Sequence, residues 1–468
     1  MTSCKARAAL LALAGMILPT LSQAAADDVA TLRAELDALK KEYTTRVDAL
    51  EQRIATLESA PVGALAQSAP AEAPPAMAMP SQSGSAPGTA FNPAMSLILA
   101  GSYTDTSQDP DTWRIGGFIP SGGEVGPGAR SFNLGESEIT LAANVDPYFS
   151  AQMTAALTGD DEVEVEEAFF RTLALPEGFT AKGGRFFSGF GYLNEVHAHA
   201  WDFVDQPLAY QAFFGGQFKQ DGLQVKWLAP TDLFIELGAE TGNGDEFPGT
   251  QRNRNGLNGA TLFAHVGGDI DDATSWRAGA AYLDQHAEDR AWDTIDEFGL
   301  PLTNSFTGKS QTWVVDGVLK WTPVGDPQRR QLKVQGEYMR RRESGDLTFD
   351  TAGSNLSDGY RSTQSGWYLQ GVYQFLPRWR AGLRYDALDS GTPHIALVES
   401  GELPLSAFPT LLPADPDRIS IMLDWNPSEF TRLRAQYDWD NARDEDDRDR
   451  VFRLQYIYGI GAHGAHKF

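Results

Sequence analysis

Two histidines and two aspartates lie close together in one short stretch of the chain. His197 and His199 are two positions apart, and Asp202 and Asp205 follow them. Neutral imidazole and carboxylate oxygens are suitable ligands for Zn²⁺ and similar divalent metals. If the stretch is extended, the two imidazoles face the same way. If it is helical, Glu195 and His199 share one face with the aspartates. Either geometry places imidazole beside carboxylate.

The same stretch supports two further interpretations. In a channel its charges would attract cations without binding them tightly. In a folded loop they would only hydrogen-bond to their surroundings. Residues 189–207 are rich in aromatic side chains, which disfavours a flexible solvated loop. His463 and His466 lie near the end of the chain, and we do not expect them to join this group. The sequence leaves a metal site, a cation-attracting ring and a polar folded loop open.

Four arginines occur in two later segments of alternating polarity. Arg380 and Arg384 lie in one segment, and Arg432 and Arg434 in the other. Because successive side chains of a strand point to opposite faces, each pair shares a face opposite to the apolar residues. In a barrel these arginines would face the lumen, where acid and base on opposite sides would set a transverse field. Salt bridges between neighbouring strands are the alternative.

The first residues have the pattern of an export signal. Lys5 and Arg7 precede an apolar run over 8–18, and small residues follow, which predicts a cleaved signal peptide over 1–26. The chain's one cysteine, Cys4, lies inside it. The mature chain therefore has neither a disulfide nor a cysteine metal site.

Two segments of different composition precede the main domain. Apolar residues recur every three or four positions through 27–58, which predicts a short coiled coil. We expect it to lie in the periplasm and to join three copies of the chain. A single helix packed on the domain that follows is the alternative. Residues 59–92 are rich in Ala, Pro and Ser and predict a linker.

From residue 93 to residue 468 the apolar period changes to two. Ile419, Ile421 and Leu423 alternate with polar neighbours, for example. No stretch after the signal peptide approaches the roughly 18 consecutive apolar residues of a membrane-spanning helix. Alternation combined with a signal peptide predicts a transmembrane β-barrel, with apolar side chains outward and polar ones inward. A soluble β-sandwich also alternates and is the alternative.

The connections between these segments alternate in length. Short turns are expected at places such as 146–147 and 426–428, and long connections at places such as 189–214, 286–308 and 346–360. Short periplasmic turns and longer outer loops are typical of outer-membrane barrels. The turns and loops together predict about 16 antiparallel strands, a size that leaves room for an aqueous channel.

The last strand carries an expected assembly signal. Tyr456 and Tyr458 have the same parity as the terminal Phe468. A final strand that ends in an aromatic residue resembles the signal by which the barrel assembly machinery recognises bacterial outer-membrane proteins.

Several motifs resemble known porins. The segments 165–170, 184–187 and 189–191 are similar to the strand–turn–strand before the constriction loop of phosphate-selective porins of the O and P type. The coiled coil, the linker, the His-Ala-His-Ala-Trp-Asp-Phe-Val-Asp stretch and the Gly-Ala-His-Gly-Ala-His ending resemble little-characterised outer-membrane proteins often labelled zinc-regulated or TonB-dependent. The resemblance implies a porin fold, trimeric or monomeric, in which the 189–214 loop enters the barrel and shapes its constriction.

These observations favour a porin of the bacterial outer membrane that passes small hydrophilic solutes or ions. The main alternative is a zinc-binding receptor or uptake protein that uses the His/Asp stretch. A structural tether through the coiled coil is a third possibility. No local signature of a lipase-like Ser/His site is present, so no enzyme is expected. We expect no cofactor beyond a divalent metal such as zinc. The net charge of −25 disfavours nucleic acid as a partner.

Overall fold

The computed structural model describes the main domain almost completely. The predicted signal peptide, coiled coil, linker and terminal Phe468 lie outside the described residues, apart from Lys41. The described residues are Lys41 and 93–461, without 123–124, 160–161, 252, 296–298, 327–328 and 446.

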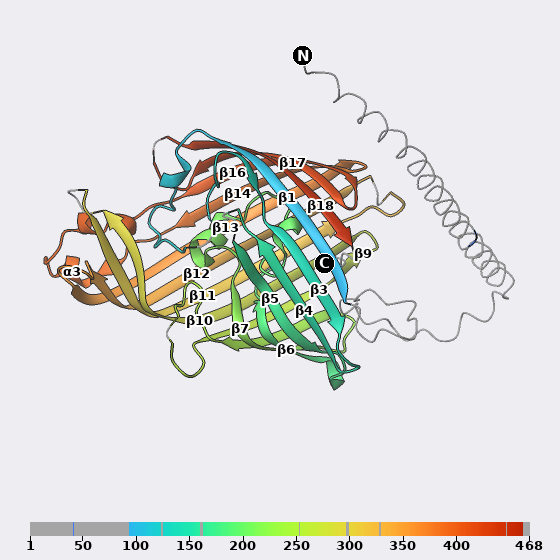
Figure 1. Ribbon diagram of the computed structural model, residues 1–468, viewed down its shortest axis with the longest axis horizontal. Helices are drawn as coiled ribbons and strands as arrows, with labels where there is room; N and C mark the ends of the chain where they lie inside the picture. The colour runs from blue at the N-terminus through green and yellow to red at the C-terminus, as the bar shows by residue number, and fades with distance from the viewer. Residues whose placement is uncertain are drawn as a thin grey trace, which may run out of the picture. The chain divides into compact units, whose positions relative to one another are not determined.

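Sixteen strands of the described residues form a closed antiparallel barrel (Figure 1). The barrel closes because β1 pairs with both β18 and β3, from Ser96 opposite Gly461 and from Ala94 opposite Ala142. The prediction of about 16 strands is confirmed. The strands are β1 Ala94–Thr106, β3 Ser137–Asn144, β4 Phe149–Leu157, β5 Val163–Thr172, β6 Phe179–Phe187, β7 Lys219–Leu228, β8 Phe234–Gly242, β9 Gly259–Asp271, β10 Thr274–Ile295, β11 Pro301–Trp321, β12 Gln331–Phe349, β13 Leu356–Leu376, β14 Trp379–Asp389, β16 Asp417–Ser428, β17 Thr431–Asn441 and β18 Asp449–Gly461.

The inside and outside of the barrel follow the predicted alternation. Ile421 and Leu423 of β16 are exposed on the outer face, whereas Ser420 and Asp424 are buried inside. Leu383 of β14 and Leu454 of β18 likewise face outward. Apolar side chains therefore cover the outer surface, and polar side chains line much of the interior.

Two of the predicted long connections are wrong, because they are mostly strand. β10 continues to Ile295 and β11 begins at Pro301, inside the expected loop over 286–308. Similarly, β12 continues to Phe349 and β13 begins at Leu356, inside 346–360. In Figure 1 these four long strands reach past their neighbours toward the end of the barrel where α3 (Ala396–Glu399) lies.

An apolar cluster explains why these strands extend. Trp292, Phe306 and Leu347 are buried on their inner side and pack with Leu397 and Phe408 from the connection between β14 and β16. The local pattern of each segment cannot reveal apolar partners that lie 50 to 116 positions further along the chain, so both segments were expected to be loops.

The remaining elements are short. The turn predicted at 426–428 lies at 429–430, because β16 continues to Ser428 with an irregular register after Trp425. Among the described residues, no helix is both long and apolar enough to cross a lipid bilayer. The short elements are β2 Ser131–Leu134, β15 His394–Ile395, α2 Leu208–Phe214 and the 3₁₀ turns η1 Pro110–Thr112, η2 Pro176–Gly178, η3 Ala198–Ala200, η4 Leu405–Ala407 and η5 Pro409–Leu411.

Candidate functional site

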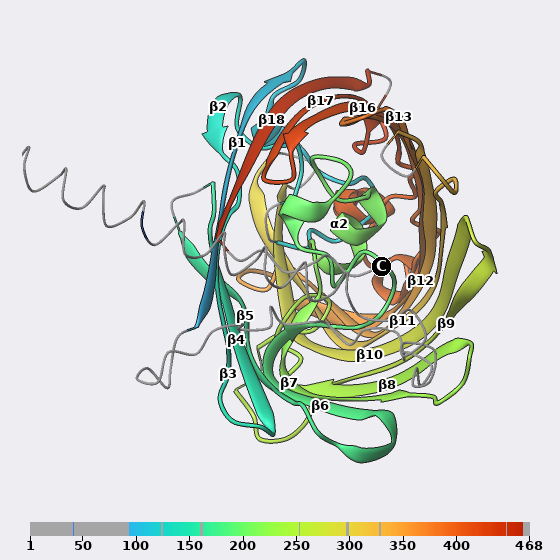
Figure 2. The same cartoon turned by 90° about the vertical axis from the view of Figure 1, so that its right-hand side faces the viewer.

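Residues 188–218, here called the lumen loop, connect β6 to β7 and lie inside the ring of strands. Figure 2 looks along the barrel and shows α2 of this loop within the ring. The two ends of the loop are joined by Asn194, which is fully buried. Its Nδ2 donates hydrogen bonds to the carbonyl oxygens of Ser188 and Phe218, each at 2.8 Å, and its Oδ1 accepts one from the Phe218 backbone N–H at 2.8 Å.

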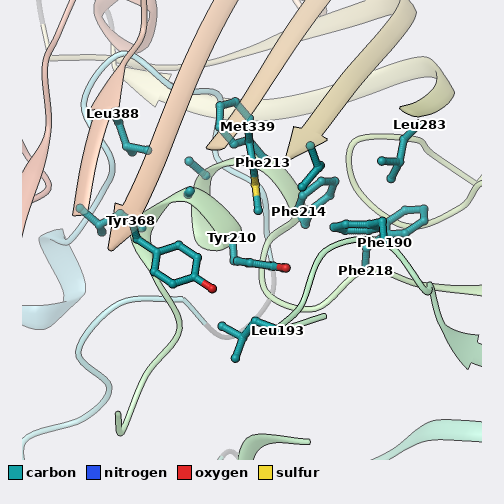
Figure 3. Packing of buried hydrophobic residues seen from close by; sticks show 14 of the residues in the cluster. Phe190, Leu193, Tyr210, Phe213, Phe214, Phe218, Leu283, Met339, Tyr368 and Leu388 are labelled. Carbon is teal, nitrogen blue, oxygen red and sulfur yellow. The ribbon is translucent and has the colours of Figure 1, made fainter. Parts of the chain in front are cut away.

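One side of the lumen loop is apolar and packs against the barrel wall. All seven residues of α2 are buried, and the helix ends at Gly215, whose φ of 70° is the left-handed conformation that glycine adopts most easily. Phe213 and Phe214 belong to one cluster with Leu283 and Met339 of the wall (Figure 3). Burying this face holds α2 against β10–β14 and leaves the polar residues of the loop on its other side.

A carboxylate of the barrel wall supports the apolar side. Glu337 of β12 accepts hydrogen bonds from the backbone N–H of Leu193 at 3.0 Å and from the hydroxyls of Tyr210 and Tyr368 at 2.9 and 2.8 Å. The sequence does not single out Glu337, because its partners lie on distant elements.

The two aspartates of the lumen loop contact cationic side chains. Asp202 pairs with Arg380 at 3.0 Å and with Lys333. Asp205 pairs with Arg384, Arg418 and Arg453, at 2.8, 2.9 and 3.2 Å. These cations project from β12, β14, β16 and β18.

The same cations keep both aspartates ionised. Burial alone would raise the pKa of Asp205, but Arg418, Arg453 and Arg384 outweigh it and hold that pKa well below its usual range. Lys333 and Arg380 act in the same way on the pKa of buried Asp202. The two aspartates thus serve as anionic anchors of the lumen loop.

All four arginines that the sequence places in the lumen face inward. Arg432 donates to the backbone carbonyls of His199 and Trp201 at 3.1 and 3.0 Å, and Arg434 donates to that of Trp201 at 2.6 Å. Arg434 also pairs with Asp424 of the neighbouring strand at 2.7 Å. Salt bridges between neighbouring strands therefore occur together with contacts to the lumen loop.

The two histidines of the lumen loop contact carboxylates instead. The Nδ1 atom of His197 lies 3.2 Å from an oxygen of Glu166 and 3.3 Å from an oxygen of Glu138. Its Nε2 atom lies 3.2 Å from Glu167. His199 approaches the other oxygen of Glu138 with its Nδ1 atom, at 2.7 Å. These glutamates belong to β3 and β5.

These contacts favour a charged imidazole. Burial alone would lower the pKa of His197, but hydrogen bonds with Glu138, Glu166 and Glu167 outweigh it and hold that pKa well above its usual value. Glu195, the other predicted site residue of this stretch, is half-buried and interacts electrostatically with Lys226 of β7.

A β-bulge in β5 brings two consecutive glutamates to the same side. Thr154 of β4 pairs with Glu167, but the next residue, Ala155, pairs with Val165, so Glu166 is the extra residue. A bulge redirects a side chain that regular alternation would send to the opposite face. Both Glu166 and Glu167 are consequently buried and contact His197.

The structure thus gathers the predicted residues in two groups. His197 and His199 stack at 5.9 Å between ring centroids and contact β3 and β5. Asp202 and Asp205 contact cations of four other strands. Sequence reasoning missed Glu138, whose pairing with His199 spans 61 positions. The adjacent pair Glu166–Glu167, within an otherwise alternating strand, was the one local signal of a bulge.

Comparison with known proteins identifies one relative. No family model matches the chain. An uncharacterised protein of Aquifex aeolicus (strain VF5) is 31% identical over 358 residues, which cover 72% of this chain and 70% of that protein. The chain belongs to the same family as this protein.

Solved barrels with a similar arrangement share much less sequence. OprB of Pseudomonas putida is 15% identical with a TM-score of 0.46, over 79% of this chain and 94% of that one. The DcaP channel of Acinetobacter baumannii is 13% identical with a TM-score of 0.45, over 79% and 97%. The anion-selective porin of Comamonas acidovorans is 9% identical with a TM-score of 0.46, over 79% and 99%. Similarity at this level does not carry a function from one barrel to another.

Proposed function

We propose that the chain is a porin of the bacterial outer membrane through which small hydrophilic solutes or ions diffuse. The closed barrel supports this proposal, because it satisfies every backbone hydrogen-bonding group within lipid without leaving a strand edge. Its apolar outer surface suits contact with lipid. Barrels of this strand number are wide enough for an aqueous channel.

The observation that carries the proposal is the path of the lumen loop. The loop is held by carboxylates of β3 and β5 on one side and by cations of β12–β18 on the other. Solvent reaches charged side chains on both sides, since the side chains of His197, Arg432 and Lys333 are 20%, 20% and 25% exposed. Segment 189–214 would thus narrow a passage lined by fixed charges of both signs, which selects solutes by size and charge.

Planar-bilayer recording of the purified full-length protein tests the pore. Insertion should produce stepwise increases of current that are linear in voltage. A heat-unfolded sample of the same preparation is the control and should produce none. Protein whose barrel is shown to be folded, by its heat-modifiable mobility on a gel, but which gives no current steps would exclude the porin.

A further inference from the structure

We propose that His197, Glu138 and Glu166 form a binding site for a zinc-like divalent cation inside the barrel. The site differs from the one expected from sequence, because Asp202 and Asp205 are engaged with cations and glutamates of the wall take their place. It does not depend on conduction through the pore.

The ligand atoms already have the spacing of a metal site. One atom each from His197, Glu138 and Glu166 lie within 4.8 Å of one another. Zn–N and Zn–O bonds of about 2.0–2.2 Å in a tetrahedron place neighbouring ligands roughly 3.4 Å apart. The two observed separations from His197 Nδ1, 3.2 and 3.3 Å, are close to that value. An ion bound there would take the position of the Nδ1 proton.

The surrounding groups form hydrogen bonds that orient the proposed metal ligands. A metal-bound histidine almost always directs its other ring nitrogen to a carboxylate or a carbonyl, which fixes its orientation. Glu167 occupies this position, 3.2 Å from His197 Nε2. The second oxygen of Glu138 is held by His199 at 2.7 Å. The bulge at Glu166 is what allows β5 to supply both a ligand and the carboxylate behind the histidine.

Charge also favours a cation at this position. Glu138, Glu166 and Glu167 place three carboxyl groups against the two imidazoles. Arg171, further along β5, interacts electrostatically with Glu167. The His197 and His199 side chains are 20% and 11% exposed, so an ion can reach them from the lumen.

Other histidine–carboxylate pairs of the described residues lack this convergence. His265 pairs with Glu236, and His394 pairs with Glu399 on the exposed rim, but neither pair belongs to a group of three possible metal ligands within the described part of the chain. Imidazole with carboxylate suits zinc and its first-row neighbours better than Mg²⁺ or Ca²⁺, which prefer oxygen ligands only. We therefore expect selection by ligand chemistry and not by charge alone.

Calorimetric titration of the detergent-solubilised full-length protein with Zn²⁺ tests the site. The starting protein carries His463→Gln and His466→Gln, so that these two histidines do not contribute to the measured Zn²⁺ binding. One equivalent of Zn²⁺ should bind, and excess Mg²⁺ should not displace it. His197→Gln should weaken binding at least about 100-fold, and Glu167→Gln about 10- to 100-fold, as loss of an outer carboxylate usually does.

His394→Gln is the matched control, because it removes a histidine–glutamate pair that lacks the third ligand, and it should leave Zn²⁺ affinity unchanged. Absence of stoichiometric binding, equal displacement by Mg²⁺, or full binding by His197→Gln would each overturn the site. His197 lies on the loop, so this variant tests the site without altering a barrel strand. A protein that conducts but does not bind Zn²⁺ would refute the metal site alone.

Discussion

At the scale of single residues, Asn194 holds both ends of the lumen loop together. Asn194→Ala removes three hydrogen bonds. The Phe218 carbonyl keeps the hydrogen bond from the Ser188 N–H at 3.1 Å, but the Ser188 carbonyl and the Phe218 N–H lose their Asn194 partner. Each unsatisfied buried group costs about 1–3 kcal/mol. We expect a lower melting temperature and larger fluctuations of the open-channel current, because Asn194 no longer joins the two ends of the lumen loop.

Circular dichroism during heating and single-channel recording measure the two effects of Asn194→Ala. The matched control is Asn133→Ala, since the Asn133 amide also bonds to backbone carbonyls but on the exposed surface. Equal effects of the two substitutions would contradict the role given to Asn194.

Asp205 neutralises part of a buried cluster of arginines. Asp205→Asn keeps the shape of the side chain but removes the charge that faces Arg384, Arg418 and Arg453. Breaking a buried ion pair by removing one partner costs about 3–5 kcal/mol. We expect the variant to unfold at lower temperature and to pass a larger current, because the loop leaves the arginine wall. A variant that keeps both the wild-type melting temperature and the wild-type current would contradict this anchor.

The loss of stability caused by Asp205→Asn should become smaller at low pH. The folded-state pKa of Asp205 is depressed, so its stabilisation is fully present above the unfolded pKa of about 3.9. It is lost only as pH falls further, through the lower folded pKa. The difference in melting temperature between wild type and Asp205→Asn should therefore stay constant from pH 8 to about pH 5 and shrink below about pH 4. A difference that disappears near neutral pH would show that another group is responsible.

At the scale of elements, the sequence predicts which face of a strand is apolar better than it predicts which residues that face contacts. The alternation of β14, β16, β17 and β18 placed apolar side chains outward, since one face of each strand has one polarity. The ends of β10–β13 were misassigned, because their inner faces are covered by a distant connection. The histidines could be recognised by type, but Glu138 and the bulge at Glu166 depend on strand pairing. For the same reason, closeness in sequence wrongly suggested that the histidines and aspartates share one set of neighbours.

The position of the lumen loop predicts which side chains border the passage. The chain's one cysteine, Cys4, lies in the predicted signal peptide, so we expect a single introduced cysteine to be labelled without interference once that peptide is cleaved. Lys333 of β12 points to Asp202 and is 25% exposed. We expect a bulky, membrane-impermeant thiol reagent to reduce the current through Lys333→Cys in steps, because the label occupies the passage.

The comparison for Lys333→Cys is His394→Cys, at the exposed rim, where the side chain is 67% exposed. Labelling there should leave the current nearly unchanged. If the label reduces the current through His394→Cys but not through Lys333→Cys, the narrow part of the passage does not lie at the lumen loop.

At the scale of the whole molecule, the described barrel needs no partner to close, since β1 pairs with both of its neighbours. Any contact that joins copies of the chain would therefore lie outside the strand pairing of the described barrel. Residues 27–58 carry the apolar repeat of a coiled coil, which is polar on its remaining faces and marginally stable as a single helix. We therefore propose that the barrel closes without a partner and that the segment before it joins three copies of the chain.

Deleting 27–58 should therefore convert a trimer to monomers without changing the barrel. Light scattering after size-exclusion chromatography gives the mass, with the detergent contribution subtracted, and heat-modifiable gel mobility reports barrel folding. Deleting 59–90 is the matched control, because it removes an equal length of linker that has no apolar repeat. A trimer that survives loss of 27–58 would place the interface on the barrel surface. Monomers from both deletions would instead show that the spacing between the two segments, and not the apolar repeat, controls assembly.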